Sequence, residues 1–419
     1  MRLALTLQRV DPSKGGAETY VADLCGRLIV AGHDVDLYAS RWREGVLPRE
    51  VRTIKVEPRG WTKLTKIWNF AVDSEAMRRA ANRYDCTVGF INTWGDDVLI
   101  PQGGVHAASR HANAKRFAAG WRRNLYMLSK QLNPKQLLLY RAIERRQYDP
   151  RRSTRFVAVS TMVQGHLHRF LNVAPERVRV IPNAIDADRL KVADPVIVRR
   201  AFRAEHGLKP DDLTALFVGH NFWLKGLKPL LEALKLRSDR SPGIRPIHLL
   251  VCGGGNLAPF RRMVEDLGLA SVVKLFGFQA DIRPCFHAAD FFALPTYYDP
   301  CSLVVFEALA CGLPVITTGC NGAGELITPG REGLVVEHPE MIDRLADALD
   351  TMIDDDARAR MARAAISLGR EQSFDRHVSR LVELFREVAA GQASRTPHTR
   401  SETSVFPGDS HASDRTRGW

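Results

Sequence analysis

The sequence predicts an α/β protein of two doubly wound domains, and its length and its pattern of apolar residues both support this class. The chain has 419 residues, which exceeds the roughly 250–300 residues at which a single core usually stops growing. Short apolar runs alternate with longer helical patterns along most of the chain, as expected for parallel sheets made of βαβ units. Hydrophobic residues make up 45% of the chain and charged residues 26%, which agrees with a folded enzyme and excludes a disordered or collagen-like chain.

The apolar runs form two series, and each series predicts the strands of one Rossmann-like sheet. An amphipathic helix is expected over Ala17–Ala31, between the first two strands. The first series consists of Leu3–Leu7, Val35–Ala39, Thr87–Ile91 and Phe156–Val159. The second consists of Ala215–Val218, His248–Cys252, Val273–Phe276, Phe291–Leu294, Pro314–Thr317 and Gly333–Val335.

A proline turn divides the two series and predicts the domain boundary. A strand near Val180 ends at Pro182-Asn183, before an irregular connection that suits a hinge. We therefore expect a first domain over 1–183 and a second over 184–373. A terminal helix over 374–390 is expected to pack back on the first domain. Residues 391–419 are polar and lack apolar periodicity, which predicts a disordered tail.

The charge and the cysteines restrict the partners and the compartment. A net charge of +13 indicates an anionic partner, such as a nucleic acid, a membrane surface or a phosphorylated substrate. The 7 cysteines form no C-x-x-C pair, which predicts reduced thiols and no zinc site. The N-terminus does not resemble a secretory signal, and no segment approaches the roughly 18 apolar residues of a membrane span. We therefore expect a cytoplasmic protein.

The stretch 105–155 is rich in arginine and lysine, with bulky apolar residues interleaved. Cationic and apolar faces on the same helices predict peripheral attachment to an anionic membrane surface, here the inner face of the cytoplasmic membrane. The alternative is a core-packed helix pair with a solvated charged face. We expect no nucleic-acid binding, because no nucleic-acid-binding module accompanies the charge.

Two segments of the first half contain candidate site residues. Gly15 and Gly16 lie where the first strand turns into a helix, so a ligand can approach the backbone and a phosphate can use the free N–H groups of the helix. Asp97 and His106 follow a strand end, where open α/β sheets place ligands, and can receive a proton from an attacking hydroxyl. The alternatives are a tight turn for the glycines and turn or capping roles for the other two.

The second half contains the strongest motif, over 299–316. Asp299 opens a loop, a helix begins near Ser302, and Glu307 lies inside that helix. The helix start can bind a diphosphate through backbone N–H groups, while a carboxylate about one and a half turns further on can accept hydrogen bonds from ribose hydroxyls. Lys225 follows another strand and can neutralise charge on a departing phosphate.

Taken together, these motifs resemble glycosyltransferase family 4, whose members are retaining enzymes of the GT-B fold. The family signature is E-x7-E followed by an alanine-rich helix and Gly-x-Pro. The resemblance extends in order through Gly15–Glu18, Val180–Asp186, Lys225-Gly226, Asp299–Val315 and Gly322–Glu325. Within the family, the chain looks most similar to lipopolysaccharide core glucosyltransferases.

The resemblance implies a role for each matching residue. Gly15 and Gly16 are expected beside the donor phosphates, and Asp97 near the sugar and the acceptor. Lys225 is expected to bind the diphosphate, Glu307 the ribose, and Asp299 the transferring sugar. The residues expected to offer backbone N–H groups to phosphate are Ser302, Leu303 and Val304.

Two departures from the family pattern are visible, and no metal site is expected. Asp299 replaces the usual glutamate, and the basic residue that the family usually has before its lysine is absent, with Leu224 or His220 in the vicinity instead. Asp186-Ala187-Asp188 follows a proline turn and is interpreted as a loop or a helix cap, so the helix dipole and Lys225 are expected to replace a divalent ion.

The resemblance implies a hexosyltransferase that uses a nucleotide sugar, UDP-glucose above all, as its substrate and has no bound cofactor. The expected acceptor is a lipid-linked or cell-envelope glycan such as lipopolysaccharide core heptose, and the expected stereochemistry is retention. Three alternatives stay open: a transferase with another nucleotide sugar and a soluble acceptor, a nucleotide-sugar epimerase, and a non-catalytic basic binding protein.

Overall fold

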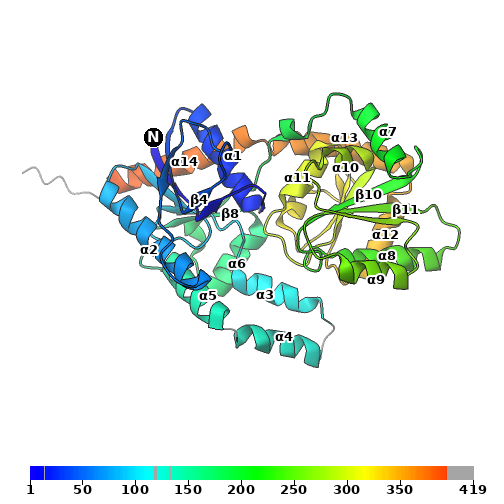
Figure 1. Cartoon of the computed structure of the whole chain (residues 1–419), viewed down its shortest axis with the longest axis horizontal. Helices are drawn as coiled ribbons and strands as arrows, with labels where there is room; N and C mark the ends of the chain where they lie inside the picture. Colours follow the sequence, from blue (N-terminus) through cyan, green and yellow to red (C-terminus); the bar gives the residue numbers. More distant parts are fainter. Residues whose placement is uncertain (14, 118–119, 133, 394–419) are drawn as a thin grey trace, which may run out of the picture.

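The computed structural model describes residues 1–13, 15–117, 120–132 and 134–393 (Figure 1). The tail expected over 391–419 lies outside the described residues from 394 onward. Two parallel sheets flanked by helices form two Rossmann-like domains, which lie side by side in Figure 1. Among the described residues, no helix is long and apolar enough to span a bilayer.

The first sheet has 7 strands in the order β5-β3-β1-β6-β7-β8-β9. Its strands are β1 (Arg2–Thr6), β3 (Asp34–Ala39), β5 (Arg52–Lys55), β6 (Cys86–Gly89), β7 (Val98–Leu99), β8 (Arg155–Ala158) and β9 (Val178–Val180). Two short strands, β2 (Arg9–Val10) and β4 (Arg41–Trp42), pair separately. The helices of this domain are α1 (Gly16–Val30), α2 (Lys63–Ala81), α3 (His106–Lys115), α4 (Trp121–Gln131), α5 (Pro134–Gln147) and α6 (Thr161–Leu171).

The second sheet has 6 strands in the order β12-β11-β10-β13-β14-β15. They are β10 (Leu213–Val218), β11 (Ile247–Cys252), β12 (Val273–Gly277), β13 (Phe291–Leu294), β14 (Val315–Thr318) and β15 (Gly333–Val336). The helices are α7 (Pro195–Glu205), α8 (Leu227–Arg240), α9 (Ala258–Asp266), α10 (Arg283–Ala288), α11 (Leu303–Ala310), α12 (Ile342–Thr351) and α13 (Asp355–Glu371). The strand order reverses beside β1 in the first sheet and beside β10 in the second. Doubly wound folds with this topology bind ligands at the carboxyl ends of their strands.

The structure confirms the predicted strands, with ends shifted by one or two residues. Parallel strands are buried on both faces, so they appear in the sequence as continuous apolar runs. The sequence did not predict β5, a polar edge strand with exposed ends, or β7, which is only 2 residues long. Neither strand carries an apolar run long enough to distinguish it from a loop.

The last helix, α14 (Phe374–Ala393), leads from the second domain back to the first and contacts α1 and β6 (Figure 1). His377 lies between Tyr20 and Pro182, with Nε2 at 2.6 Å from the Tyr20 hydroxyl and Nδ1 at 2.8 Å from the Pro182 carbonyl. Burial lowers the pKa of His377 to about 4, so the ring is neutral at pH 7. A carbonyl can only accept, so Nδ1 donates to Pro182 and Nε2 accepts from Tyr20.

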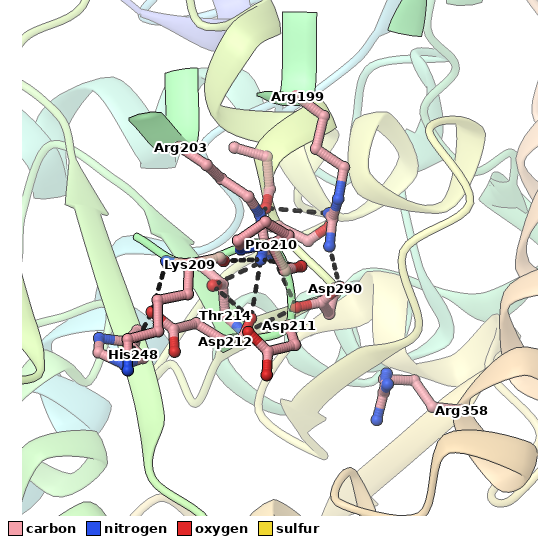
Figure 2. A network of polar contacts seen from close by, with 12 residues as sticks. Arg199, Arg203, Lys209, Pro210, Asp211, Asp212, Thr214, His248, Asp290 and Arg358 are labelled. Carbon is pink, nitrogen blue, oxygen red and sulfur yellow. Dashed lines mark hydrogen bonds and ion pairs between the residues drawn. The ribbon is translucent and has the colours of Figure 1, made fainter. Parts of the chain in front are cut away.

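Arg203 anchors α7 to the amino-terminal edge of the second sheet (Figure 2). Its guanidinium is buried and donates to Asp290 at 2.9 Å and to the Thr214 hydroxyl at 3.2 Å. A further nitrogen, Nη1, donates to backbone carbonyls in the loop before β10. Arg199 binds the other oxygen of Asp290 at 2.6 Å. The ion pairs therefore lie at the edge opposite the one where ligands bind.

We predict that Arg203→Met lowers the free energy of unfolding by about 3 kcal/mol, because Asp290 and several carbonyls lose their buried donor. Urea denaturation of the two proteins measures this difference. Arg200→Met on the exposed face of the same helix is the control, with an expected change within about 0.5 kcal/mol. Equal losses in both variants would contradict an anchoring role for Arg203.

Candidate active site

Loops from both sheets meet at a seam between the domains. Ser160, which follows β8, donates to the carbonyl of Pro300 at 2.7 Å, and Asn183 donates to the carbonyl of Cys301 at 3.0 Å. Gly322 packs so closely that a Cβ there would clash with the Pro300 carbonyl and also with the side chain of Ser160 in the first domain. The loop after β13 is therefore held directly against the first domain.

A carboxylate of the second domain also binds a helix end of the first. Glu325 accepts the backbone N–H groups of Thr161 and Met162 at 2.8 and 2.6 Å, at the N-terminus of α6. The positive end of the helix dipole favours a carboxylate at this position. Glu325 therefore joins the two domains rather than facing the open part of the seam.

Lys225 and Asp299 come together as an ion pair, although 74 positions separate them in sequence. Lys225 belongs to the loop after β10, and Asp299 to the loop after β13. Their side chains are 22% and 9% exposed, so the lysine remains accessible to a ligand while the carboxylate is nearly covered. The structure thus brings together two of the residues that the sequence singled out, and the lysine charge is partly balanced by Asp299.

The start of α11 lies beside this pair and is held by Asn321. The buried side-chain oxygen of Asn321 accepts the N–H groups of Ser302 at 3.3 Å and of Ala323 at 3.1 Å. The Ser302 N–H is therefore engaged within the protein, which corrects the expectation that it is offered to phosphate. Leu303 and Val304 are the first helical residues of α11, and their N–H groups have no acceptor within the helix.

Asn321 is not among the site residues that the sequence predicts. An asparagine directly before Gly322-Ala323-Gly324 is a recognisable signal for a cap or a turn. Its contact with Ser302 depends on the loops after β13 and β14 lying side by side, and a single sequence does not show that arrangement.

Glu307, one and a third turns into α11, is partly buried close to α1. Burial raises its pKa to about 7, Arg189 opposes the rise, and Asp23 adds to it. Arg189 and Asp23 themselves form an ion pair across the seam, with 2.9 Å between Nη1 and Oδ2. Glu307 is therefore a carboxylate that titrates near neutral pH at the edge of the seam.

Gly15 and Gly16 face the same helix from the first domain. A Cβ built on Gly16 would lie 3.3 Å from the Cδ1 atom of Leu303, the first residue of α11. A Cβ on Gly15 would lie 2.8 Å from a carboxylate oxygen of Glu18. The glycine turn before α1 therefore adjoins the start of α11, as expected if both contact one ligand.

Asp97 does not join this group, which corrects its expected place near the sugar and the acceptor. Its carboxylate accepts the backbone N–H and the hydroxyl of Thr87, both at 2.8 Å. Because β6 and β7 are parallel, the chain between them runs back from the carboxyl end of β6 to the amino end of β7. Asp97 directly precedes β7 and therefore lies at the amino ends of these strands. The structure gives Asp97 a role in holding the sheet edge.

His106 begins α3, and its ring lines a pocket of about 710 Å³ between α3, α5 and α6. Its pKa is lowered to about 4, first because the surrounding protein desolvates the ring and second because Arg110 is near. The ring keeps accessible surface because it forms part of the pocket wall. The neighbouring Val105 N–H binds the Tyr298 hydroxyl at 3.1 Å, so His106 lies close to the seam but faces this pocket.

A second pocket, which sequence reasoning did not find, opens at the carboxyl edge of the first sheet. Its volume is about 450 Å³. It combines residues from the ends of β1, β3 and β6 with the first two turns of α2. We call it the cationic pocket, and its lining is Leu7, Gln8, Arg9, Glu18, Ser40, Arg41, Pro58, Lys63, Lys66, Ile67, Ile91 and Asn92.

The described residues contain no group of three His, Cys, Asp or Glu side chains that could hold a metal ion. Metal independence therefore remains a prediction, which rests on the positive groups that are present. These are Lys225 and the N-terminus of α11.

Two doubly wound domains with these loops at their seam define a glycosyltransferase of the GT-B fold. The family model described as "Glycosyltransferase Family 4" matches residues 14–189. The model described as "Glycosyl transferases group 1" matches residues 198–368. The chain belongs to the glycosyltransferases that these two models describe, and this protein is a glycosyltransferase.

Relatives of two kinds share sequence with this chain. The lipopolysaccharide glucosyltransferase WaaG of Escherichia coli (strain K12) is 27% identical over 352 residues, which is 83% of this chain and 88% of the relative. The D-inositol 3-phosphate glycosyltransferase of Rhodococcus erythropolis is 31% identical over 253 residues, or 58% of this chain. That match spans only 56% of the relative's length.

Solved structures agree on the fold. The crystal structure of WaaG aligns with a TM-score of 0.74 at 23% identity, covering 91% of this chain and 99% of the other. The structure of Anabaena Alr3699/HepE in complex with UDP-glucose aligns with a TM-score of 0.65 at 18% identity, covering 94% and 100%. At these identities the likeness concerns the architecture alone.

We predict that the raised pKa of Glu307 makes the free energy of unfolding depend on pH. The folded protein binds this proton more tightly than the unfolded chain, whose carboxyl has a pKa near 4.5. The stability from this group is complete below about 4.5 and is lost as pH rises through about 7. Urea denaturation at pH 5, 6, 7 and 8 is expected to show a difference between wild type and Glu307→Gln that changes over this range.

Glu383→Gln, at an exposed position on α14, is the matched control and is expected to follow the wild-type profile. Parallel profiles for wild type and Glu307→Gln would show that the Glu307 carboxyl is not perturbed.

Proposed function

We propose that this glycosyltransferase transfers glucose from UDP-glucose, with retention, to a lipid-linked or cell-envelope glycan such as lipopolysaccharide core heptose. The main support for the proposed donor-binding site is the Lys225–Asp299 ion pair, which lies beside the free N–H groups at the start of α11. The similarity to WaaG over 83% of the chain supports the choice of glucose and of the acceptor class.

In the proposed reaction, the N–H groups of Leu303 and Val304 bind the donor diphosphate together with Lys225, because negative charge grows on the leaving phosphate. The Glu307 carboxylate accepts hydrogen bonds from the ribose hydroxyls. Asp299 holds the Lys225 ammonium in place and borders the transferring sugar. Gly15 and Gly16 allow the phosphates to approach the backbone of the first domain.

The bond between the anomeric carbon and the diphosphate oxygen breaks, and a bond from that carbon to the acceptor oxygen forms on the same face. The acceptor proton passes to the departing phosphate oxygen, so UDP leaves with it. This step needs no protein base near the acceptor, which agrees with the position of Asp97 at the opposite edge of the sheet.

A second candidate is a transferase with a soluble, phosphorylated acceptor. The observation that favours it is the 31% identity to D-inositol 3-phosphate glycosyltransferases over part of the chain. The family assignment sets aside the epimerase and the non-catalytic binding protein.

The proposed membrane contact is the exposed apolar stripe of α4. Its residues and their exposed fractions are Trp121 (69%), Leu125 (55%), Leu128 (50%) and Leu132 (68%). A spacing of four, three and four residues places them on one face of the helix. In Figure 1, α3 and α4 lie side by side and project away from the first sheet. Lys115, Arg116 and Arg123 lie around their connection, so cations flank an unburied apolar face.

We predict that Lys225→Ala lowers kcat by about 10²- to 10³-fold, because the leaving diphosphate loses its cation. Release of UDP from UDP-glucose in the presence of a glycan acceptor measures this effect. Lys228→Ala, a partly exposed lysine on α8 paired with Glu232, is the control and is expected to retain activity. Full activity in Lys225→Ala would overturn the assignment of the donor site.

Calorimetric titration with UDP, GDP and ADP, with and without Mg²⁺, tests the donor and the metal in one experiment. We predict UDP binding of equal affinity in both buffers, and about tenfold weaker binding by Glu307→Gln, because the ribose loses hydrogen bonds to a charged group. Binding that appears only with Mg²⁺ would contradict metal independence. Preference for GDP or ADP would contradict the proposed donor.

We predict that the double variant Trp121→Ser/Leu125→Ser loses most binding to vesicles of phosphatidylcholine and phosphatidylglycerol in a sedimentation assay, because its apolar face no longer enters the interface. Val196→Ser/Ile197→Ser is the control, since these side chains are 64% and 63% exposed on α7, far from α4 in the chain. Unchanged vesicle binding by the α4 variant would exclude this stripe as the contact.

A further inference from the structure

We infer that the acceptor carries a phosphate group and that the cationic pocket of the first domain binds it. This inference rests on the proposed function, because it names the chemical class of the acceptor. The pocket lies at the carboxyl ends of β1, β3 and β6, the edge at which open α/β sheets bind ligands.

The charge of the pocket is not balanced from within. Four cations line it, and the only carboxylate in the lining is Glu18. Glu18 pairs with Arg9 at 3.3 Å. Arg41, Lys63 and Lys66 form no ion pair with any described residue, although each lines the same concave surface.

The three cations without an ion-pair partner repel each other, and the concave surface of the cationic pocket strengthens their combined electrostatic field. A phosphate monoester carries nearly two negative charges near neutral pH and several acceptor oxygens, so it can bind an arginine and two lysines together. A single carboxylate would leave more of this charge unbalanced. The composition of the pocket therefore favours phosphate.

Ser40 adds a buried hydroxyl to the lining of the pocket. Its side chain is 6% exposed, and its hydroxyl has no hydrogen-bond partner among the described residues. Buried hydroxyl groups are nearly always hydrogen-bonded in folded proteins. Ser40 belongs to the pocket lining together with Gln8 and Asn92, but its hydroxyl oxygen has almost no accessible surface, so the cations supply the contacts to a ligand.

The pocket adjoins the proposed donor site. Glu18, in its wall, lies against Gly15, and the next residue, Gly16, faces Leu303 at the start of α11. The pocket is thus near enough to the donor site for one acceptor to reach both when its sugar hydroxyls point toward the seam. The phosphate would orient the acceptor without taking part in the transfer.

The test is calorimetric titration with glucose 6-phosphate in the presence of saturating UDP, so that the donor phosphate site is already filled. We expect binding by wild type and at least about tenfold weaker binding by Lys63→Ala/Lys66→Ala, since each lysine contributes a charge-assisted bond. The control is Arg43→Ala/Arg49→Ala, which removes the same charge from exposed positions outside the pocket lining and should bind as wild type does.

Three further ligands identify the recognised group. Inorganic phosphate is expected to bind more weakly than glucose 6-phosphate, whereas glucose is expected not to bind and glucuronate to bind weakly. Equal binding of glucose 6-phosphate by wild type and Lys63→Ala/Lys66→Ala, or no binding by wild type, would overturn the inference. Stronger binding of glucuronate would replace phosphate by a carboxylate and overturn it as well.

A wrong assignment of the UDP donor would give a different result from a wrong assignment of the cationic pocket. If wild type binds no UDP, the donor assignment is wrong, while the comparison of the two double variants with glucose 6-phosphate alone still decides the pocket. Loss of binding only in Lys63→Ala/Lys66→Ala would then support a phosphate site in a protein with another donor.

Discussion

The side-chain amide of Asn321 holds together the two loops on which the proposed donor site is built. Its oxygen accepts N–H groups from both loops, and its nitrogen donates to Thr317 at 3.1 Å. Backbone bonds between Asp299 and the residues on either side of Asn321 reinforce the contact. Loss of this amide would leave buried N–H groups unsatisfied, at a cost of about 1–3 kcal/mol each. The position of Asp299, and through it of Lys225, therefore depends on a residue that contacts neither the proposed phosphate nor the sugar.

In the part of the chain that the structure describes, three groups of cations are placed where they can meet anions. Lys225 lies at the seam, Arg41, Lys63 and Lys66 line the cationic pocket, and the basic residues around α3 and α4 flank an exposed apolar stripe. In our proposals these locations meet three anions: a diphosphate, an acceptor phosphate and a lipid surface. A net charge alone cannot distinguish one anionic partner from three, because it carries no information about position.

The elements that could be predicted are those whose pattern is contained in one short stretch of the sequence. The buried strands β10 and β11 appear as apolar runs, and the helix start at Leu303 follows a turn residue, so both could be placed before the fold was known. Asp97 does not lie at the predicted edge of the sheet, because it follows one strand in the sequence but stands at the start of the next strand in space. The cationic pocket was not visible, because Arg9, Arg41, Lys63 and Lys66 come from three elements that only the sheet order brings together.

The chain crosses between the domains twice, and the two crossings are bonded to each other. Ile185 on the outward path donates to the carbonyl of Gln372 at 3.2 Å and pairs with Ser373 on the return path. A twist of one domain against the other would have to break these bonds between the two crossings, whereas a bend about a line through both crossings would leave the bonds intact.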